Sequence, residues 1–265
     1  MKIIYRACET VNSVNGLPRP WGLSKREIIE LSFKSLSKAV ENKPHEIHVI
    51  GDSLSEDLIS FLKKISPEAK IESYNDLGNA KSLYKCFEKA DSFLDDDLIY
   101  FCEDDYLHFY PSFYERSLGF ADFAKGNPLD FFFHPSDYPD QYRSDNLKRG
   151  YVFALKSGHM REVSSTTFTF MCLGKTYKKH SELLKSCAMY KRLTDPKMGG
   201  IVMSDCGADD GRFSEIFGKE ALCFSPLPGI ATHLHIGTSS PFVEWEIIKE
   251  HVRQDFPEKL KIKIQ

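Results

Sequence analysis

The chain has 265 residues, of which 42% are hydrophobic, so it is long enough to bury one substantial core. Its 35 basic and 38 acidic residues give a formal net charge of -3, so no global positive field attracts nucleic acid. The seven cysteines stand singly and form no Cys-x-x-Cys pair, which argues against a zinc knuckle and against a disulfide framework. We therefore expect a protein of a reducing compartment that has no nucleic-acid partner.

Neither a signal peptide nor a membrane span is visible in the sequence. The N-terminal run reaches Arg6 too early for the apolar region of a signal peptide. No stretch approaches the ~18 consecutive apolar residues of a membrane-spanning helix. We expect a cytoplasmic protein without a transmembrane segment, and contact with a membrane-borne substrate stays open.

Short β-rich runs alternate with longer helical patterns through the first half of the chain. Ser24 is expected to begin the first helix, and Glu27 completes a capping box with it. The predicted elements are strands at 3–7, 46–50, 71–74 and 98–102 and helices at 24–40, 55–65 and 77–90. This alternation is typical of an α/β fold with a mostly parallel sheet flanked by helices.

The second half of the chain has a less regular pattern. The predicted elements are a helix at 112–124, strands at 129–134, 151–155, 162–171 and 231–235, and helices at 180–190 and after Phe242. A polar, turn-rich stretch at 135–149 has the composition of an acceptor loop. We therefore expect a smaller antiparallel portion beside the parallel sheet, and a single domain spanning 1–265.

The apolar strand at 98–102 delivers three consecutive acids, Glu103, Asp104 and Asp105, to its carboxyl end. In open α/β sheets, ligands bind at the carboxyl ends of strands. Three adjacent carboxylates repel one another and cost desolvation unless a cation compensates them. Hard oxygen ligands favour Mg²⁺ or Mn²⁺, which bind carboxylates together with substrate phosphates. The alternative is a solvated loop, or a helix N-cap at Asp104.

Three further candidates lie in the second half. His233 and His235 fall on the same face of the expected strand at 231–235, at a spacing that suits a metal or a phosphate. His235 is favoured because Gly237 follows it into a Thr- and Ser-containing segment. Arg161 begins a hydroxyl-rich run and is a candidate for neutralising phosphate. The alternatives are structural histidines, and hydroxyl residues present for β propensity alone.

Several of these segments together resemble the nucleotide-binding half of a GT-A glycosyltransferase, closest to family 2. The segments are strand 3–7, the turn at 51–52, the helix entry at 78–80 and the run 99–106. The resemblance implies a GT-A-type α/β fold and a Mn²⁺ or Mg²⁺ cofactor. It also implies a UDP-, GDP- or dTDP-sugar donor and a glycan or glycoconjugate acceptor. The nucleotide-sugar-binding half is then 1–110, the acceptor and catalytic half 111–241, and a helical tail 242–265.

The same resemblance assigns roles to the strand-end acids. Asp105 is the direct metal ligand, and Asp104 is its partner. Glu103 replaces the first Asp of an Asp-x-Asp-type motif and contacts the ribose or a metal-bound water. Four more residues are placed beside the donor, Arg6, Glu9 and Asp52 near the base and Lys81 near a phosphate. For Arg6 and Asp52 the alternatives are an ion pair with a neighbouring acid and a turn residue, respectively.

The segment 207–213 resembles the late acidic motif of that family. The resemblance makes Asp210 the catalytic base, with Asp209 standing where the family usually has Glu. The alternative is that these residues cap a helix. Gly199 and Gly200 resemble the glycine loop beside the donor sugar, where only glycine lets the backbone approach a ligand closely. A C-terminal metal ligand of the family matches His233 or His235.

The sequence thus predicts a metal-dependent glycosyltransferase that inverts configuration with an Asp base. Two alternatives remain, a non-catalytic sugar-nucleotide or glycan-binding module and a nucleotidyltransferase. Against a nucleotidyltransferase, the sequence has no Gly-rich basic loop after the first strand that would hold a triphosphate. A Rossmann dehydrogenase is set aside because no strand is followed by Gly-x-Gly-x-x-Gly.

Overall fold

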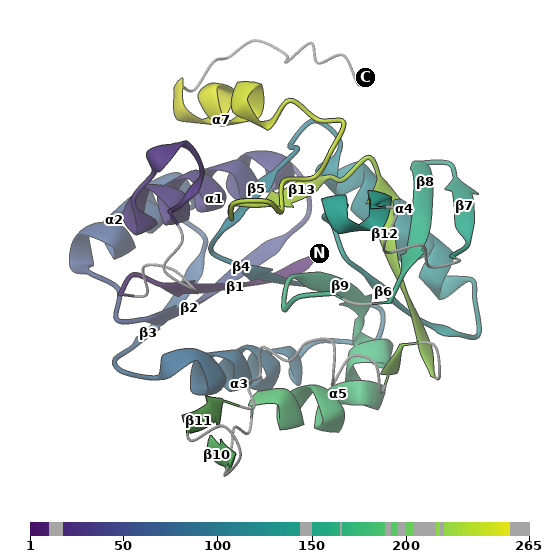
Figure 1. Cartoon of the computed structure of the whole chain (residues 1–265), viewed down its shortest axis with the longest axis horizontal. Helices are drawn as coiled ribbons and strands as arrows, with labels where there is room; N and C mark the ends of the chain where they lie inside the picture. The colour runs from purple at the N-terminus through teal and green to yellow at the C-terminus, as the bar shows by residue number, and fades with distance from the viewer. Residues whose placement is uncertain are drawn as a thin grey trace.

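The structure, a computed structural model, describes residues 1–10, 18–143, 150–164, 166–188, 192–195, 200–203, 216–217 and 220–254. Its centre is a nine-stranded sheet in the order β3-β2-β1-β4-β9-β6-β12-β8-β7 (Figure 1). The strands are β1 (Lys2–Cys8), β2 (Glu46–Asp52), β3 (Lys70–Tyr74), β4 (Leu98–Glu103), β6 (Asp130–Phe133), β7 (Val152–Leu155), β8 (Gly158–Val163), β9 (Phe170–Leu173) and β12 (Ala221–Leu227). Among these strands, β8 and β9 run against the others. The predicted mostly parallel α/β class is confirmed.

Two small antiparallel sheets accompany the large one. Strand β5 (Tyr106–His108) pairs with β13 (Ala231–His233), and β10 (Arg192–Asp195) pairs with β11 (Gly200–Met203). The first of these sheets joins the segment that directly follows β4 to the C-terminal part of the chain. It therefore brings the strand-end acids close to the histidines near residue 233.

Helices cover both faces of the large sheet. They are α1 (Lys25–Val40), α2 (Glu56–Ile65), α3 (Gly78–Ala90), α4 (Phe113–Lys125), α5 (Gly174–Ala188) and α7 (Trp245–Gln254), with short 3-10 turns η2 (Pro20–Gly22) and η3 (Pro139–Tyr142). Figure 1 shows α1 and α2 on one face and α3 and α5 on the other. None of the helices in the described ranges is long and apolar enough to cross a membrane.

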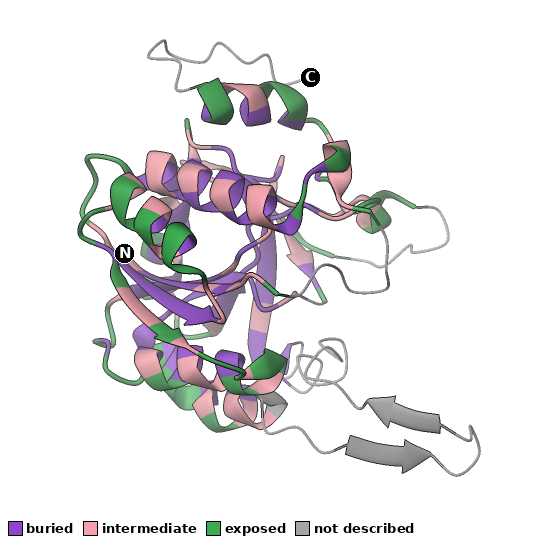
Figure 2. Cartoon of the chain, turned by 90° about the vertical axis from the view of Figure 1, so that its left-hand side faces the viewer, coloured by how far each residue is buried: buried purple, intermediate pink, exposed green. Residues whose placement is uncertain are grey.

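The central strands are buried on both faces, as parallel strands covered by helices are. Along β1, Tyr5 packs into the core that α1 and α4 cover, whereas Ile4 packs into the core that α3 and α5 cover. Along β4, Tyr100 and Phe101 divide between the two cores in the same way. Figure 2 shows this buried sheet between two helical layers whose outer faces are exposed. Successive side chains of a strand point to opposite faces of the sheet. Every second residue after Ile4 on β1 and after Phe101 on β4 therefore faces α3.

The predicted helix starts are confirmed by their caps. The Ser24 hydroxyl accepts a hydrogen bond from the Glu27 amide and the Glu27 carboxylate accepts from the Ser24 amide, which completes the capping box. The Ser55 hydroxyl accepts from the Leu58 amide at the start of α2. These local signals fix the chain direction just after β1 and β2.

The strand predicted at 162–171 is wrong. Strand β8 ends at Val163, and the separate strand β9 lies between β4 and β6, antiparallel to both. The hydroxyl of Thr166, between the two strands, hydrogen bonds to the His134 side chain at 2.8 Å instead of pairing in a strand. The helix predicted at 180–190 begins at Gly174, and the strand predicted at 231–235 ends at His233.

Candidate functional site

The strand-end acids stand at the carboxyl edge of the sheet, where the sequence places them. Strand β4 ends at Glu103, which is the register partner of Arg6 on the parallel strand β1. Asp104 and Asp105 form the turn that leads into β5. Because β1 and β4 are neighbours in the middle of the sheet, the three carboxylates lie at the centre of this edge.

Each of the three carboxylates has its own counter-cation. The Glu103 carboxylate lies 2.5 Å from Nη2 of Arg6, which belongs to β1. The other two pairs join Asp104 to Lys25 Nζ at 2.5 Å and Asp105 to Arg19 Nη1 at 3.0 Å. The chain itself therefore supplies a cation beside each of the three acids, and the metal ion predicted at Asp105 stays a prediction.

Asp104 is buried, and both of its carboxylate oxygens accept hydrogen bonds from the protein. Only 7% of the residue is exposed, and its Oδ2 accepts a hydrogen bond of 2.8 Å from the Cys8 amide at the end of β1. Its Oδ1 accepts from Lys25, the first residue of α1. Asp104 thus ties the end of β1 and the start of α1 to the end of β4, and its oxygens are engaged by the fold.

Asp105 is the acid whose contacts differ. Its Oδ2 lies 3.0 Å from Arg19 Nη1 and 3.3 Å from His233 Nε2. Its Oδ1 is buried without a hydrogen-bond partner in the described part of the chain. The approach of His233 follows from the backbone, since His233 pairs with Tyr106 across β5 and β13 and the Leu234 amide donates to the Asp105 carbonyl at 2.6 Å. The structure therefore brings together one predicted metal carboxylate and one predicted metal histidine.

The ring of His233 stacks on two other rings. It lies parallel to Tyr106, with centroids 4.9 Å apart and planes at 13°. His235 also stacks on it at 5.7 Å and 20°, while Nδ1 of His235 contacts the Ile236 carbonyl. It is therefore His233 that meets Asp105, although the sequence favoured His235.

The ion pair shifts both pKa values. Burial alone would raise the pKa of Asp105, but the charges of His233, Lys25 and Arg19 outweigh it and hold the pKa well below its usual range. Burial alone would lower the pKa of His233, but the Asp105 carboxylate outweighs it and raises the pKa. The pair is therefore a carboxylate beside an imidazole that favours its charged form.

Hydroxyl groups fix Tyr106 beneath His233. The Tyr106 hydroxyl lies 2.8 Å from the Tyr138 hydroxyl and 2.8 Å from the Thr167 hydroxyl. Next to them, Nδ1 of His134 contacts the Thr169 carbonyl at 2.9 Å, and burial lowers the pKa of His134 to about 4. Because Tyr106 is fully buried, it supports His233 and does not present its ring to a sugar.

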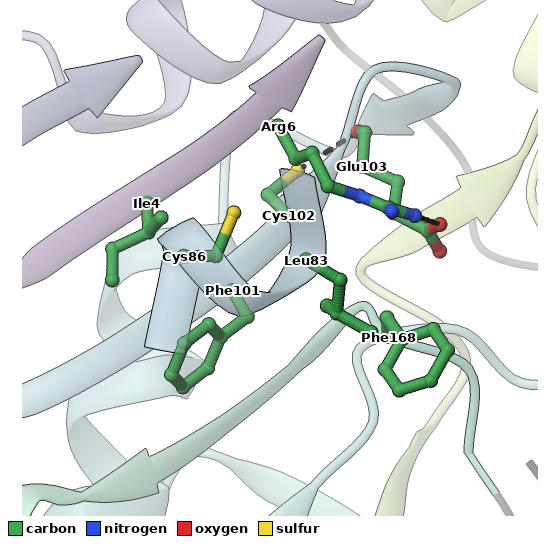
Figure 3. Close-up of a pocket in the computed structure, with 8 residues that line it drawn as sticks. All are labelled: Ile4, Arg6, Leu83, Cys86, Phe101, Cys102, Glu103 and Phe168. Carbon is green, nitrogen blue, oxygen red and sulfur yellow. Dashed lines mark hydrogen bonds and ion pairs between the residues drawn. The ribbon is translucent and has the colours of Figure 1, made fainter. Parts of the chain in front are cut away.

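Arg6 and Glu103 lie at the mouth of a narrow pocket on the α3 side of the sheet (Figure 3). The pocket is lined by Ile4, Arg6, Leu83, Cys86, Phe101, Cys102, Glu103 and Phe168. It encloses about 10 Å³, which is the space of one water molecule, so a nucleoside does not fit in it. Arg6 also donates to Asn79 Oδ1 at 2.7 Å. The ion pair that was the alternative for Arg6 is what the structure shows.

Glu9 and Asp52, both predicted beside the donor base, hold helix starts. Glu9 accepts from the Ser55 amide at 2.8 Å, at the start of α2. Asp52 accepts from the Leu77 and Gly78 amides at 3.0 and 2.8 Å, at the start of α3. These contacts match the structural alternative for Asp52.

Lys81 lies exposed on α3, three residues after Gly78 begins the helix.

Arg161 lies on β8, with β9, β6 and β12 between it and β4. Four inter-strand spacings of ~4.8 Å separate these strands by ~19 Å. Arg161 pairs with the buried Asp137 and lies over the Tyr142 ring at 4.5 Å. The structure thus places Arg161 on the antiparallel strand β8, apart from the strand-end acids.

Three predicted residues, Gly199, Asp209 and Asp210, lie outside the described residues. Gly200 begins β11 in the separate β10–β11 hairpin. The roles given to these residues by the sequence stay predictions.

Sequence reasoning missed Arg19 and Lys25. Lys25 directly follows the N-cap Ser24, so the capping box fixes its position but gives no sign of its partner. Arg19 precedes the Pro20–Gly22 turn in a segment without periodicity, and its contact with Asp105 joins parts of the chain far apart in sequence. No local pattern could have found either ion pair.

Asp105 and His233 fit the protein side of a Mn²⁺ or Mg²⁺ site. His233 Nε2 lies 3.3 Å from Asp105 Oδ2, and the other carboxylate oxygen, Oδ1, is buried without a partner in the described ranges. Carboxylate oxygen is the ligand type that suits Mn²⁺ and Mg²⁺. Within the described ranges, no group of three or more His, Cys, Asp or Glu side chains that could hold a metal is found. Two protein ligands leave the other positions to phosphate oxygens and water, which is the usual arrangement for Mg²⁺ at a phosphate site.

No protein-family model matches the chain, and no curated protein matches it. Among solved structures, an active-site mutant of LgtC is 11% identical with a TM-score of 0.48, and 98% of each chain is covered. A mannose-6-phosphate isomerase from Helicobacter pylori is 13% identical with a TM-score of 0.47, over 87% of this chain and 98% of that chain. A putative glucose-1-phosphate thymidylyltransferase from Bacillus anthracis is 12% identical with a TM-score of 0.46, over 97% of each chain. Likenesses at these TM-scores and identities assign no activity to this chain.

Proposed function

We propose that the chain is a metal-dependent glycosyltransferase that moves a sugar from a nucleotide-diphospho-sugar to a hydroxyl acceptor. The observation that carries the proposal is the meeting of Asp105 and His233 at the carboxyl end of β4, with one buried carboxylate oxygen left without a partner. This is the edge of an α/β sheet where ligands bind. The resemblance of the run 99–106 to the nucleotide-binding half of GT-A enzymes supports the same assignment.

In the proposed site Asp105 and His233 would hold Mn²⁺ or Mg²⁺, with His233 giving up its proton to bind the ion as a neutral imidazole. The bound cation supplies charge stabilisation for the leaving nucleoside diphosphate. Tyr106 keeps the His233 ring in the plane that faces Asp105, since the two rings stack at 13°. The ion pair between Asp104 and Lys25 fixes the turn after β4.

The acceptor hydroxyl needs a base that removes its proton as the new bond forms. We assign this role to Asp210, beside Asp209, on the resemblance of the segment 207–213 to the late acidic motif. Attack opposite to the leaving group would then invert the configuration at the sugar carbon. The donor is proposed to be a UDP-, GDP- or dTDP-sugar, and the acceptor a glycan or glycoconjugate.

The test is release of nucleoside diphosphate from each of the three donor classes in the presence of Mn²⁺. Asp105→Asn should lower the rate by on the order of a hundredfold, because one stabilising group of the leaving phosphate is lost. Asp95→Asn removes an exposed carboxylate paired with Lys178 and serves as the matched control, with an unchanged rate. No release from any donor by the wild-type protein would overturn the proposal.

The product separates this proposal from its catalytic rival. Glycosyl transfer releases a nucleoside diphosphate, whereas a nucleotidyltransferase acting on a nucleoside triphosphate and a sugar phosphate releases pyrophosphate. Pyrophosphate release that depends on Asp105 would favour the rival. Donor binding that persists in Asp210→Asn without turnover of either kind in the wild type would favour a non-catalytic binding module.

A further inference from the structure

The guanidinium of Arg19 lies beside the carboxylate of Asp105. Its Nη1 lies 3.0 Å from Asp105 Oδ2 and 3.4 Å from the Leu234 carbonyl. Only 8% of its side chain is exposed. Taking a guanidinium out of water is costly, so a group placed so deeply needs a compensating negative charge nearby.

The segment that carries Arg19 is anchored to the body of the protein. Trp21 lies under the ammonium group of Lys249 from α7, with 4.9 Å between nitrogen and ring centroid. Leu23 packs in a buried cluster with Leu234 and Trp245. The backbone between these anchors is tight, with Trp21 at a φ of 57°. Arg19 is thereby held at the strand-end acids by contacts on its C-terminal side.

The charge balance changes when a divalent cation joins Asp105. Glu103 and Asp104 are already neutralised by Arg6 and Lys25, so they offer no spare negative charge. Asp105 carries one negative charge and already faces both Arg19 and His233. A divalent ion at Asp105 therefore leaves an excess of positive charge, which a diphosphate at the same place would balance.

From this balance we propose that Arg19 is a diphosphate-binding residue that Asp105 holds in place. When the cation and a nucleoside diphosphate bind, the Arg19 guanidinium exchanges Asp105 for the diphosphate oxygens, to which it can donate two parallel hydrogen bonds. Binding of the cation and binding of the diphosphate are then mutually dependent, because each compensates the charge that the other brings. The inference rests on the proposed function and adds to it the residue that recognises the leaving group.

The experiment compares binding of Mn²⁺ alone with binding of diphosphate at saturating Mn²⁺. Free Mn²⁺ is followed by electron paramagnetic resonance, and pyrophosphate, UDP, GDP and dTDP are titrated by calorimetry. In Arg19→Gln the Kd of the bound diphosphate should rise at least about tenfold, since a charge-assisted hydrogen bond is lost. The Kd for Mn²⁺ alone should stay equal or fall, because a competing cation has left Asp105.

Two variants make the comparison specific. Arg19→Lys keeps the charge without the planar fork and should recover part of the lost diphosphate affinity. Arg253→Gln removes an exposed guanidinium paired with Glu27 and should leave both affinities unchanged. Arg19→Lys also keeps the test usable where Arg19→Gln fails to fold.

Two results would overturn the inference while the proposed function stands. One is diphosphate binding by Arg19→Gln as tight as that of the wild type. The other is an equal loss of Mn²⁺ and diphosphate affinity, which would make Arg19 a support for Asp105 only. If the wild type binds no nucleoside diphosphate at saturating Mn²⁺, the proposed function fails, and the inference fails with it.

Discussion

At the scale of single residues, the three adjacent acids are chemically distinct because their partners differ. Glu103 faces Arg6 across two neighbouring strands, and Asp104 is buried against Lys25. Asp105 alone meets an imidazole and keeps an oxygen without a partner in the described ranges. A run of identical charges in sequence thus becomes two structural ion pairs and one candidate ligand.

His233 and His235 should likewise differ in how much each contributes to Mn²⁺-dependent binding of a nucleoside diphosphate. His233→Ala should weaken Mn²⁺-dependent nucleoside diphosphate binding by about tenfold or more, since a ligand beside Asp105 is removed. His235→Ala removes a ring that stacks on His233 and leaves the contact between His233 and Asp105 in place, so it should change that affinity much less. Calorimetric titration of both variants with a nucleoside diphosphate and Mn²⁺ measures the difference. Equal losses in the two variants would contradict the assignment of His233.

Asp104 should behave as a stability residue. Asp104→Ala leaves Lys25 and the Cys8 amide without their acceptor inside the protein, and should lower the free energy of unfolding by about 3 to 5 kcal/mol. Urea denaturation monitored by circular dichroism measures the change. Glu115→Ala, which breaks an exposed pair with Lys43, should cost less than about 1 kcal/mol and is the control. A loss for Asp104→Ala as small as that of the control would show that the contacts of Asp104 contribute little to the free energy of unfolding.

At the scale of elements, β5 joins the sheet edge to α1 through His108. Its ring contacts the Ser35 hydroxyl of α1 at 3.1 Å and the Tyr100 hydroxyl of β4 at 2.9 Å. The residue is fully buried, and burial lowers the pKa of His108 to about 3. The fold therefore holds this imidazole neutral in conditions where the unfolded chain would protonate it.

This difference predicts a loss of stability in mild acid. The unfolded His108 gains a proton as the pH falls below about 6.5, whereas the folded one stays neutral until about pH 3. The unfolded state thus binds more protons in this window, so the free energy of unfolding falls as the pH falls. His108→Asn should remove about one proton from that dependence, or about 1.4 kcal/mol per pH unit between pH 4 and 6. Urea denaturation at several pH values measures both slopes, and identical slopes would contradict the account.

The elements also show what the sequence could and could not predict. The starts of α1 and α2 were predictable, because their caps are local hydrogen bonds within three residues. The position of β9 was not, because an apolar run gives no information on which strands it joins, and β9 inserts between β4 and β6. The pairing of β13 with β5 was missed for the same reason, although it is what brings His233 to Asp105.

At the scale of the whole molecule, the predicted α/β class holds because alternating helices and strands leave few ways to bury both faces of a sheet. The strand-end position of the acids follows from that class. Their counter-cations do not, because Arg19 and Lys25 reach them only through the tertiary fold. Glu9 and Asp52 show that polar residues after strands also hold the start of the next helix, and their placement beside the donor base stays a prediction.

The central claim is that Asp105 and His233 hold a divalent cation against a nucleoside diphosphate. Thermal unfolding of the wild type and of Asp105→Asn, with UDP, GDP or dTDP and with or without Mn²⁺, tests it most directly. We predict that one nucleotide stabilises the wild type by about 2.7 kcal/mol at a hundredfold excess over its Kd, only when Mn²⁺ is present. The Asp105→Asn variant should show no such shift. Unfolding temperatures that are unaffected by every nucleotide with Mn²⁺, or shifts that are equal in the two proteins, would contradict the claim.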